Sequence, residues 1–161
     1  LEAFERVLGR EHPDTLISLN NLAGLLESKG DYEGAEQLYR EALEAKVRVL
    51  GREHVSTLTS LNNLAELLRA KGDYEGAEPL YREALEALEQ VLGREHPNTL
   101  VSLNNLARLL ESKGDYEGAE PLYREALLGL QNVLGETHPT TQIIQNNLNR
   151  LLSKLSTSPE D

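Results

Sequence analysis

Residues 72–85 read Gly-Asp-Tyr-Glu-Gly-Ala-Glu-Pro-Leu-Tyr-Arg-Glu-Ala-Leu, and residues 114–127 repeat this stretch without change. Residues 30–43 carry it again, with Gln37 in place of the proline. The Ala, Leu, Glu and Arg content favours a helix, and the leading Gly-Asp pair suits the end of one helix and the start of the next. Because the copies lie 42 residues apart, the chain is a repeat protein.

The full copies are residues 9–50, 51–92 and 93–134. Each differs from its neighbour at 10 of 42 positions, and a fourth copy starts at Gly135 but loses the pattern after one helix. We therefore predict the tail of a truncated helix at 1–8, repeats at 9–50, 51–92 and 93–134, a terminal capping helix at 135–155 and a disordered tail at 156–161.

Each copy is predicted to contain two helices, which we name A and B. Helix A is expected at about residues 13–29, 55–71, 97–113 and 139–154, opened by proline in three copies and closed by glycine. Helix B is expected from Tyr32 to Leu50 and at the equivalent positions, after an aspartate cap. Pro79 and Pro121 fall inside helix B, where a missing N–H predicts a local kink or bulge.

Ten positions of the first copy carry a resemblance to a known family. These are Leu19, Asn21, Leu22, Ala23, Gly30, Tyr32, Ala35, Tyr39, Ala42 and Leu43. This pattern resembles the tetratricopeptide repeat signature, and the period of 42 rather than about 34 residues, with the motifs LNNLA and VLGREHP, is similar to the kinesin light chain branch. The resemblance implies an all-α, right-handed solenoid of antiparallel helix pairs and a non-catalytic module that binds a peptide or partner protein.

Differences between copies indicate a binding face on helix A. The positions that vary between copies lie on one side of the helix, opposite the repeated leucines and alanines. In a solenoid of this type the A helices line the concave surface, so this side is expected to bind the partner. The expected peptide-binding residues are Ile17, Asn20, Asn21, Thr59, Asn62, Asn63, Glu66, Arg69, Val101, Asn104, Asn105, Arg108, Asn146 and Arg150.

The repeated asparagine pair leaves two roles open. A carboxamide both donates and accepts hydrogen bonds, which suits the backbone of an extended peptide, but it could equally bond an adjacent helix. We expect Asn20 and its equivalents in the binding groove, and Asn21 and its equivalents in the stack. Burial decides between the roles, because a buried amide must be hydrogen-bonded.

The charges on this face are mixed. Glu66 with Arg108, and Glu27 with Arg69 and Glu111, are expected to neutralise each other across adjacent copies. Otherwise Arg108, Arg150 and Lys154 would form a basic end for an acidic peptide or a C-terminal carboxylate.

Composition argues against other classes of function. The net charge of −11 disfavours nucleic acid, no apolar run is long enough for a membrane span, and the lack of cysteine fits a cytoplasmic location. Four histidines recur one per copy, too far apart to share a metal ion, and are expected to cap the A helices. Phosphate loops, nucleophile motifs and isolated carboxyl pairs are absent, so we expect no catalytic residue, metal or cofactor.

The two ends of the array differ. Gln142, Gln145 and Asn149 replace core residues of the earlier A helices, as a terminal cap requires. The N-terminal edge has no such cap, so the chain could form a homo-oligomer there. A structural, self-assembling module and a regulatory arm of a larger protein therefore remain alternatives to a peptide receptor.

Overall fold

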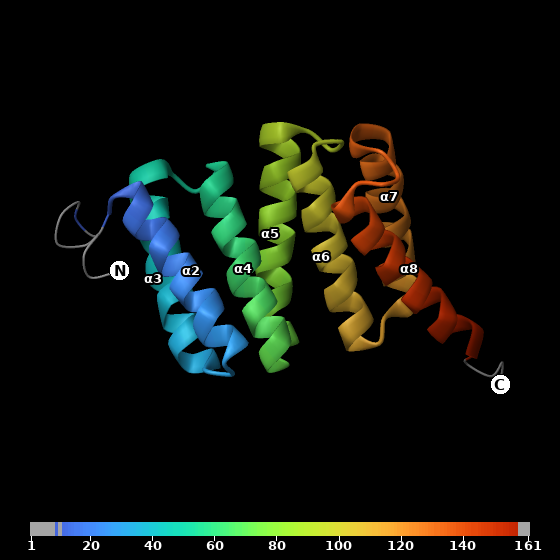
Figure 1. Ribbon diagram of the computed structural model, residues 1–161, viewed down its shortest axis with the longest axis horizontal. Helices are drawn as coiled ribbons and strands as arrows, with labels where there is room; N and C mark the ends of the chain where they lie inside the picture. Colours follow the sequence, from blue (N-terminus) through green and yellow to red (C-terminus); the bar gives the residue numbers. More distant parts are fainter. Residues whose placement is uncertain (1–8, 10, 158–161) are drawn as a thin grey trace. The chain divides into compact units, whose positions relative to one another are not determined.

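The computed structural model describes residues 9 and 11–157, and over this part of the chain it consists of helices without strands. The helices are α2 (Pro13–Ser28), α3 (Tyr32–Leu50), α4 (Val55–Lys71), α5 (Tyr74–Leu92), α6 (Pro97–Lys113), α7 (Tyr116–Leu134) and α8 (Pro139–Thr157) (Figure 1). The A helices are α2, α4, α6 and α8, and the B helices are α3, α5 and α7. The predicted helix tail at residues 1–8 lies outside the described residues.

Each A helix is capped by its histidine. Nδ1 of His54 accepts a hydrogen bond from the backbone N–H of Ser56 at 3.1 Å, and the other three histidines repeat this bond at 3.1–3.2 Å. The bond satisfies one of the N–H groups that a helix start leaves without a partner. The predicted capping role of the histidines is therefore confirmed.

The Gly-Asp pair ends one helix and starts the next. Gly72 takes the left-handed conformation (φ 82°, ψ 5°) that closes α4, and only glycine adopts this without strain. In the first copy, the Asp31 carboxylate accepts a hydrogen bond from the backbone N–H of Gly34 at 3.0 Å, at the start of α3. A Cβ on Gly34 would lie 2.6 Å from that carboxylate, which explains why glycine recurs inside the first turn of helix B.

Both internal prolines lie within continuous α-helix. Pro79 falls inside α5 and Pro121 inside α7, and neither helix is interrupted. The α-helical turns on both sides therefore tolerate the loss of one backbone hydrogen bond, and no bulge is present, while a kink at the prolines stays a prediction.

The chain divides within α5 into two units, one ending at Leu80 and one beginning at Tyr81. In the first unit α3 packs against both α2 and α4. Leu16 and Leu19 of α2 meet Ala42 and Ala45 of α3, and the small alanines allow the two helices to approach closely.

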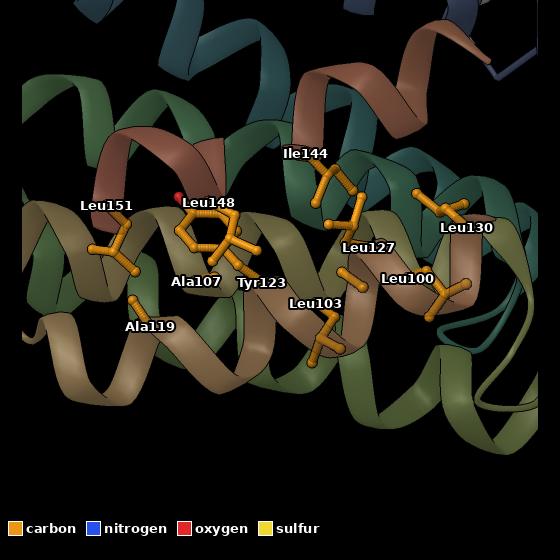
Figure 2. Close-up of a cluster of buried hydrophobic side chains, with 11 residues drawn as sticks. Leu100, Leu103, Ala107, Ala119, Tyr123, Leu127, Leu130, Ile144, Leu148 and Leu151 are labelled. Carbon is orange, nitrogen blue, oxygen red and sulfur yellow. The ribbon is translucent and has the colours of Figure 1, made fainter. Parts of the chain in front are cut away.

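In the second unit α7 packs against α6 and α8. Figure 2 shows the core between them, with the Tyr123 ring beside Leu148 and Ala107. Tyr123 and Leu151 are fully buried. The buried members of this cluster are Leu100, Leu103, Ala107, Ala119, Tyr123, Ala126, Leu127, Leu130, Ile144, Leu148 and Leu151.

Helix α8 departs from the predicted boundaries. It continues to Thr157, so Ser156 and Thr157 are helical rather than part of a disordered tail, and residues 158–161 lie outside the described range. Gln142 and Asn149 are exposed on α8, and Gln145 donates a hydrogen bond to Asn149 at 3.0 Å. This face is polar where the earlier A helices bury leucine and alanine. None of the helices described is both long and apolar enough to cross a lipid bilayer.

Candidate interaction face on the A helices

The A helices of the first unit expose part of the face expected to bind a partner. Ile17 is 54% exposed and Leu25 is 50% exposed on α2, with exposed Asn21 between them. Residues four apart lie along one side of a helix, so these three form a single stripe. On α4, Thr59 is exposed while Asn62 and Asn63 are half-buried.

An apolar pocket lies beside Ile17. Its volume is about 60 Å³, and it is bounded by the start of α2, the end of α3 and the start of α4. The lining residues are Pro13, Leu16, Ile17, Lys46, Val49, Leu50 and Ser56.

The asparagines of the first unit contact the neighbouring A helix. Nδ2 of Asn20 donates to the Leu16 carbonyl at 3.1 Å and to Ser60 Oγ on α4 at 3.4 Å. Its Oδ1 is buried and has no partner among the described residues. Asn20 thus faces α4 and is only half-buried, whereas Asn21 is exposed.

In the second unit the asparagines hold adjacent A helices together. Nδ2 of Asn147 on α8 donates to Oδ1 of Asn104 on α6 at 3.0 Å, and Asn104 donates to Asn105 at 3.3 Å. Asn104 is 5% exposed and Asn147 is 8% exposed. Asn104 was expected in the groove, and its burial instead assigns it to the stack, because its amide bonds the next A helix.

These contacts give the asparagine pair a simple geometry. The first asparagine of a pair faces the following A helix, as Asn20 and Asn104 do, and the second faces the preceding one, as Asn147 does. Asn21 and Asn146 are exposed because no described A helix precedes α2 or follows α8. Asn21 and Asn146 are the members of these pairs whose side chains are exposed.

The charged positions of this face interact with one another, and Glu27 is attracted by Arg69 as expected. Arg69 pairs within its own helix with Glu66 at 2.6 Å. Glu111 accepts hydrogen bonds from Arg150 at 2.8 and 3.1 Å and from Lys154 at 2.8 Å. Arg150 and Lys154, two of the three residues of the alternative basic end, therefore share the Glu111 carboxylate, and the basic end itself stays a prediction.

Glu111 is the most perturbed carboxyl group of this face. Burial by itself would raise its pKa, but the hydrogen bonds from Arg150, Lys154 and Tyr123 outweigh that effect and lower the pKa to about 2. Tyr123 donates to Glu111 at 2.8 Å, and burial raises the pKa of this phenol. Glu111 thus stays ionised and connects α6, α7 and α8.

Five expected residues of the second unit remain at least partly accessible. Asn146 is exposed, the Arg150 side chain is 51% exposed despite its ion pair, and Val101 is half-buried. Ile143 is a further exposed apolar residue, at 57%. Asn105 and Arg108 are half-buried.

The side chains on these faces are suited to contact with another protein. Apolar side chains, carboxamides and paired charges can bury or hydrogen-bond a chain of another protein. Over residues 9 and 11–157, no three His, Cys, Asp or Glu side chains gather in a way that could hold a metal ion.

Two residues of interest were missed by the sequence reasoning. Leu25 is half-exposed, although its equivalents Leu67 and Leu109 are fully buried. All three positions carry leucine, so comparison of the copies could not predict this difference in exposure. Lys46 is buried where the other copies have Leu88 and Leu130. The replacement of leucine by Lys46 is visible when the copies are aligned, but Lys46 lies on helix B, whereas the expected binding face lies on helix A.

Similarity to known proteins covers most of the chain. The Tetratricopeptide repeat model matches residues 1–46, 18–90 and 56–127. No curated protein matches the chain significantly. A solved structure from Podosopora anserina, described as kinesin light chain with nearly identical TPR-like repeats, has a TM-score of 0.75 at 26% identity and covers 96% of this chain and 73% of its own.

Two further structures share the fold at lower identity. BtubC (BKLC) from P. vanneervenii has a TM-score of 0.73 at 23% identity, covering 97% of this chain and 70% of its own. The N-terminal domain of stress-induced protein-1 from C. elegans has a TM-score of 0.58 at 14% identity, covering 86% and 94%. The expected all-α helical-repeat fold is confirmed, and the chain belongs to the tetratricopeptide repeat family of protein-interaction scaffolds.

Proposed function

We propose that the chain is a non-catalytic scaffold that binds an extended peptide or a partner protein along the exposed side of its A helices. The observation that carries this proposal is the exposure of Ile17 and Ile143, at 54% and 57%, at one equivalent position of α2 and α8. Each stands near an exposed asparagine, Asn21 or Asn146. Apolar anchors beside accessible amides provide both buried area and backbone hydrogen bonds for a peptide.

The test compares two exposed apolar residues of the second unit. Ile143 lies on A helix α8, and Leu128, at 61% exposure, lies on B helix α7. Peptides selected from a display library on the wild type should bind Ile143→Ser about tenfold more weakly, equivalent to roughly 1.4 kcal/mol of lost contact. Leu128→Ser should bind as the wild type does, as measured by fluorescence polarisation.

Two results would count against the proposal. Equal weakening by Ile143→Ser and Leu128→Ser would mean that the A-helix side is not the binding face. Failure to select any peptide or partner would remove the scaffold role itself. Asn104→Ala is not a suitable probe, because Asn104 bonds Asn147 and its loss would weaken the stack.

A second candidate function is self-assembly through α2. Leu25 is 50% exposed, whereas Leu67 and Leu109 at the same repeat position are fully buried. An exposed leucine at a position made for helix packing favours contact with a second copy, or with another part of a larger protein. Light scattering over a range of concentrations should then show association that Leu25→Glu abolishes. A monomer at every concentration would exclude self-assembly.

We place the chain in the cytoplasm under either proposal.

A further inference from the structure

Lys46 occupies a position that the rest of the array fills with leucine. Leu88 and Leu130 stand at the equivalent places and are 2% and 0% exposed. Lys46 is itself only 5% exposed. A charged side chain is therefore buried in the packing position of an apolar one.

The Lys46 ammonium group has two neutral acceptors. Nζ donates to Ser60 Oγ at 2.8 Å and to the Ser56 carbonyl at 3.3 Å. An ammonium carries three donors, and among the described residues no acceptor bonds the third and no carboxylate pairs with the charge. Burial of a charge without an opposite charge is unfavourable, and the pKa of Lys46 is accordingly lowered by desolvation.

The same side chain lines the apolar pocket of the first unit. The pocket volume is about 60 Å³, and its walls apart from Lys46 and Ser56 are apolar. An apolar cavity of about 150 Å³ accommodates benzene, so this one suits a body of about three carbons. The walls favour an alkyl group, and the buried ammonium favours an anion beside it.

We propose that this pocket, between the start of α2, the end of α3 and the start of α4, binds a short-chain aliphatic monocarboxylate. The carboxylate accepts a hydrogen bond from Lys46 and neutralises its charge, while the alkyl body contacts Leu16, Ile17 and Val49. An alcohol or amide offers an acceptor without the negative charge, and a second carboxylate would meet apolar walls. The site does not depend on peptide binding by the A helices.

The experiment titrates the chain with propionate and, separately, with the neutral isostere propionamide. Binding is followed by NMR on the Lys46 side chain and on the methyl groups of Leu16, Ile17 and Val49. Propionate should bind saturably and at least about tenfold more tightly than propionamide. Lys46→Leu should abolish this preference, and it should fold because leucine stands at Leu88 and Leu130.

Lys29→Leu is the matched control, since it removes the same charge from an exposed position of the same unit. It should leave propionate binding unchanged. Equal affinity for propionate and propionamide, saturable binding to Lys46→Leu, or shifts spread over exposed lysines would each overturn the proposal.

A last arm separates a free acid from the end of a polypeptide chain. A short peptide ending in valine is compared with its C-terminal amide. Tighter binding of the peptide acid than of propionate, lost in Lys46→Leu, would assign the pocket to a partner's terminus and overturn the free-acid assignment. Weaker binding of the peptide acid supports it.

Discussion

At the scale of single residues, one repeat position shows how neighbours decide the behaviour of a carboxyl group. Glu27 and Glu111 are equivalent, and each accepts a hydrogen bond from the tyrosine of its own helix B, at 3.3 and 2.8 Å. Burial raises the pKa of Glu27, and nearby Glu66 adds to the rise against the effects of Tyr39 and Arg69. Two cations from the next A helix lower the pKa of Glu111 to about 2 instead.

The first prediction concerns Glu111→Gln, which should lower the free energy of unfolding at pH 7 by roughly 2–3 kcal/mol. The folded pKa of Glu111 lies below its ordinary value of 4.5, so the stabilisation is present above that value. It is lost as the pH falls from 4.5 towards 2. Urea unfolding followed by circular dichroism should therefore show the variant and the wild type converging in acid.

Glu27→Gln is the matched control at the equivalent position. Because the pKa of Glu27 is raised, its charged form is disfavoured in the folded state, and any stabilisation belongs to the protonated form at low pH. Glu27→Gln should therefore be neutral or stabilising at pH 7 and without effect in acid. A loss of stability at pH 7 equal to that of Glu111→Gln would contradict this account.

The second prediction concerns Lys46→Leu, which should raise the free energy of unfolding at pH 7 by roughly 1–3 kcal/mol, since an apolar residue replaces a buried, uncompensated charge. The folded pKa of Lys46 lies below 10.5, so the unfolded chain binds the proton more strongly. The destabilisation is complete below the folded pKa and disappears as the pH rises towards 10.5. Urea unfolding at pH 7 and pH 10 should show the advantage of the variant shrinking with pH.

Which residues sit on the exposed side was partly predictable at this scale. Ile17, Thr59, Asn146 and Arg150 are exposed as their variation or side predicted, whereas Asn21 is exposed although it was expected in the stack. Asn104 was misplaced because an amide facing solvent and one facing the next helix look the same in sequence. The ion pairs of Glu111 with Arg150 and Lys154 were not predicted, because the expected pairs joined Glu111 to a residue at its own repeat position.

At the scale of helices, the boundaries were predictable where a residue has a single conformational use. Histidine, proline and aspartate at the starts, and glycine at the ends, placed six helices to within about one residue. The end of α8 was predicted at residue 154, but the helix continues for three more residues to Thr157. The prediction failed there because no glycine marks the end of this helix. The effect of Pro79 depends on the packing of α5 as a whole, which local sequence does not show.

The third prediction tests the contact between α6 and α7. Gly129 lies inside α7, where helix propensity alone favours alanine by about 1 kcal/mol. A Cβ on Gly129 would, however, lie 2.7 Å from both terminal methyl carbons of buried Leu100. Gly129→Ala should therefore lower the free energy of unfolding by roughly 1–2 kcal/mol, measured by urea unfolding.

A double-mutant cycle gives the control for that contact. In a Leu100→Ala background the methyl groups are gone, and Gly129→Ala should then stabilise by its propensity. Destabilisation of the same size in both backgrounds would show that the Leu100 contact is not the cause.

At the scale of the whole molecule, the two units differ in how their buried charges are paired. In the first, α3 buries the Lys46 ammonium, which bonds two neutral acceptors. In the second, buried Glu111 pairs with two cations of α8 and joins three helices. Both units expose apolar side chains, such as Leu25 on α2 and Leu128 on α7. The repeat sequence predicts equal copies, so this inequality comes from the few positions at which the copies differ and from what each helix packs against.

The fourth prediction follows from the near-neighbour nature of repeat stability, in which helices open locally rather than all at once. Amide hydrogen exchange should be at least roughly tenfold faster in α2 than in α6 and α7 at pH 7. Lys46→Leu should slow exchange in α2 and α3 and leave α6 and α7 unchanged, whereas Gly129→Ala should speed exchange in α6 and α7 alone. If either substitution changed both units equally, the chain would unfold as one cooperative body, and the local inequalities would only set its average stability.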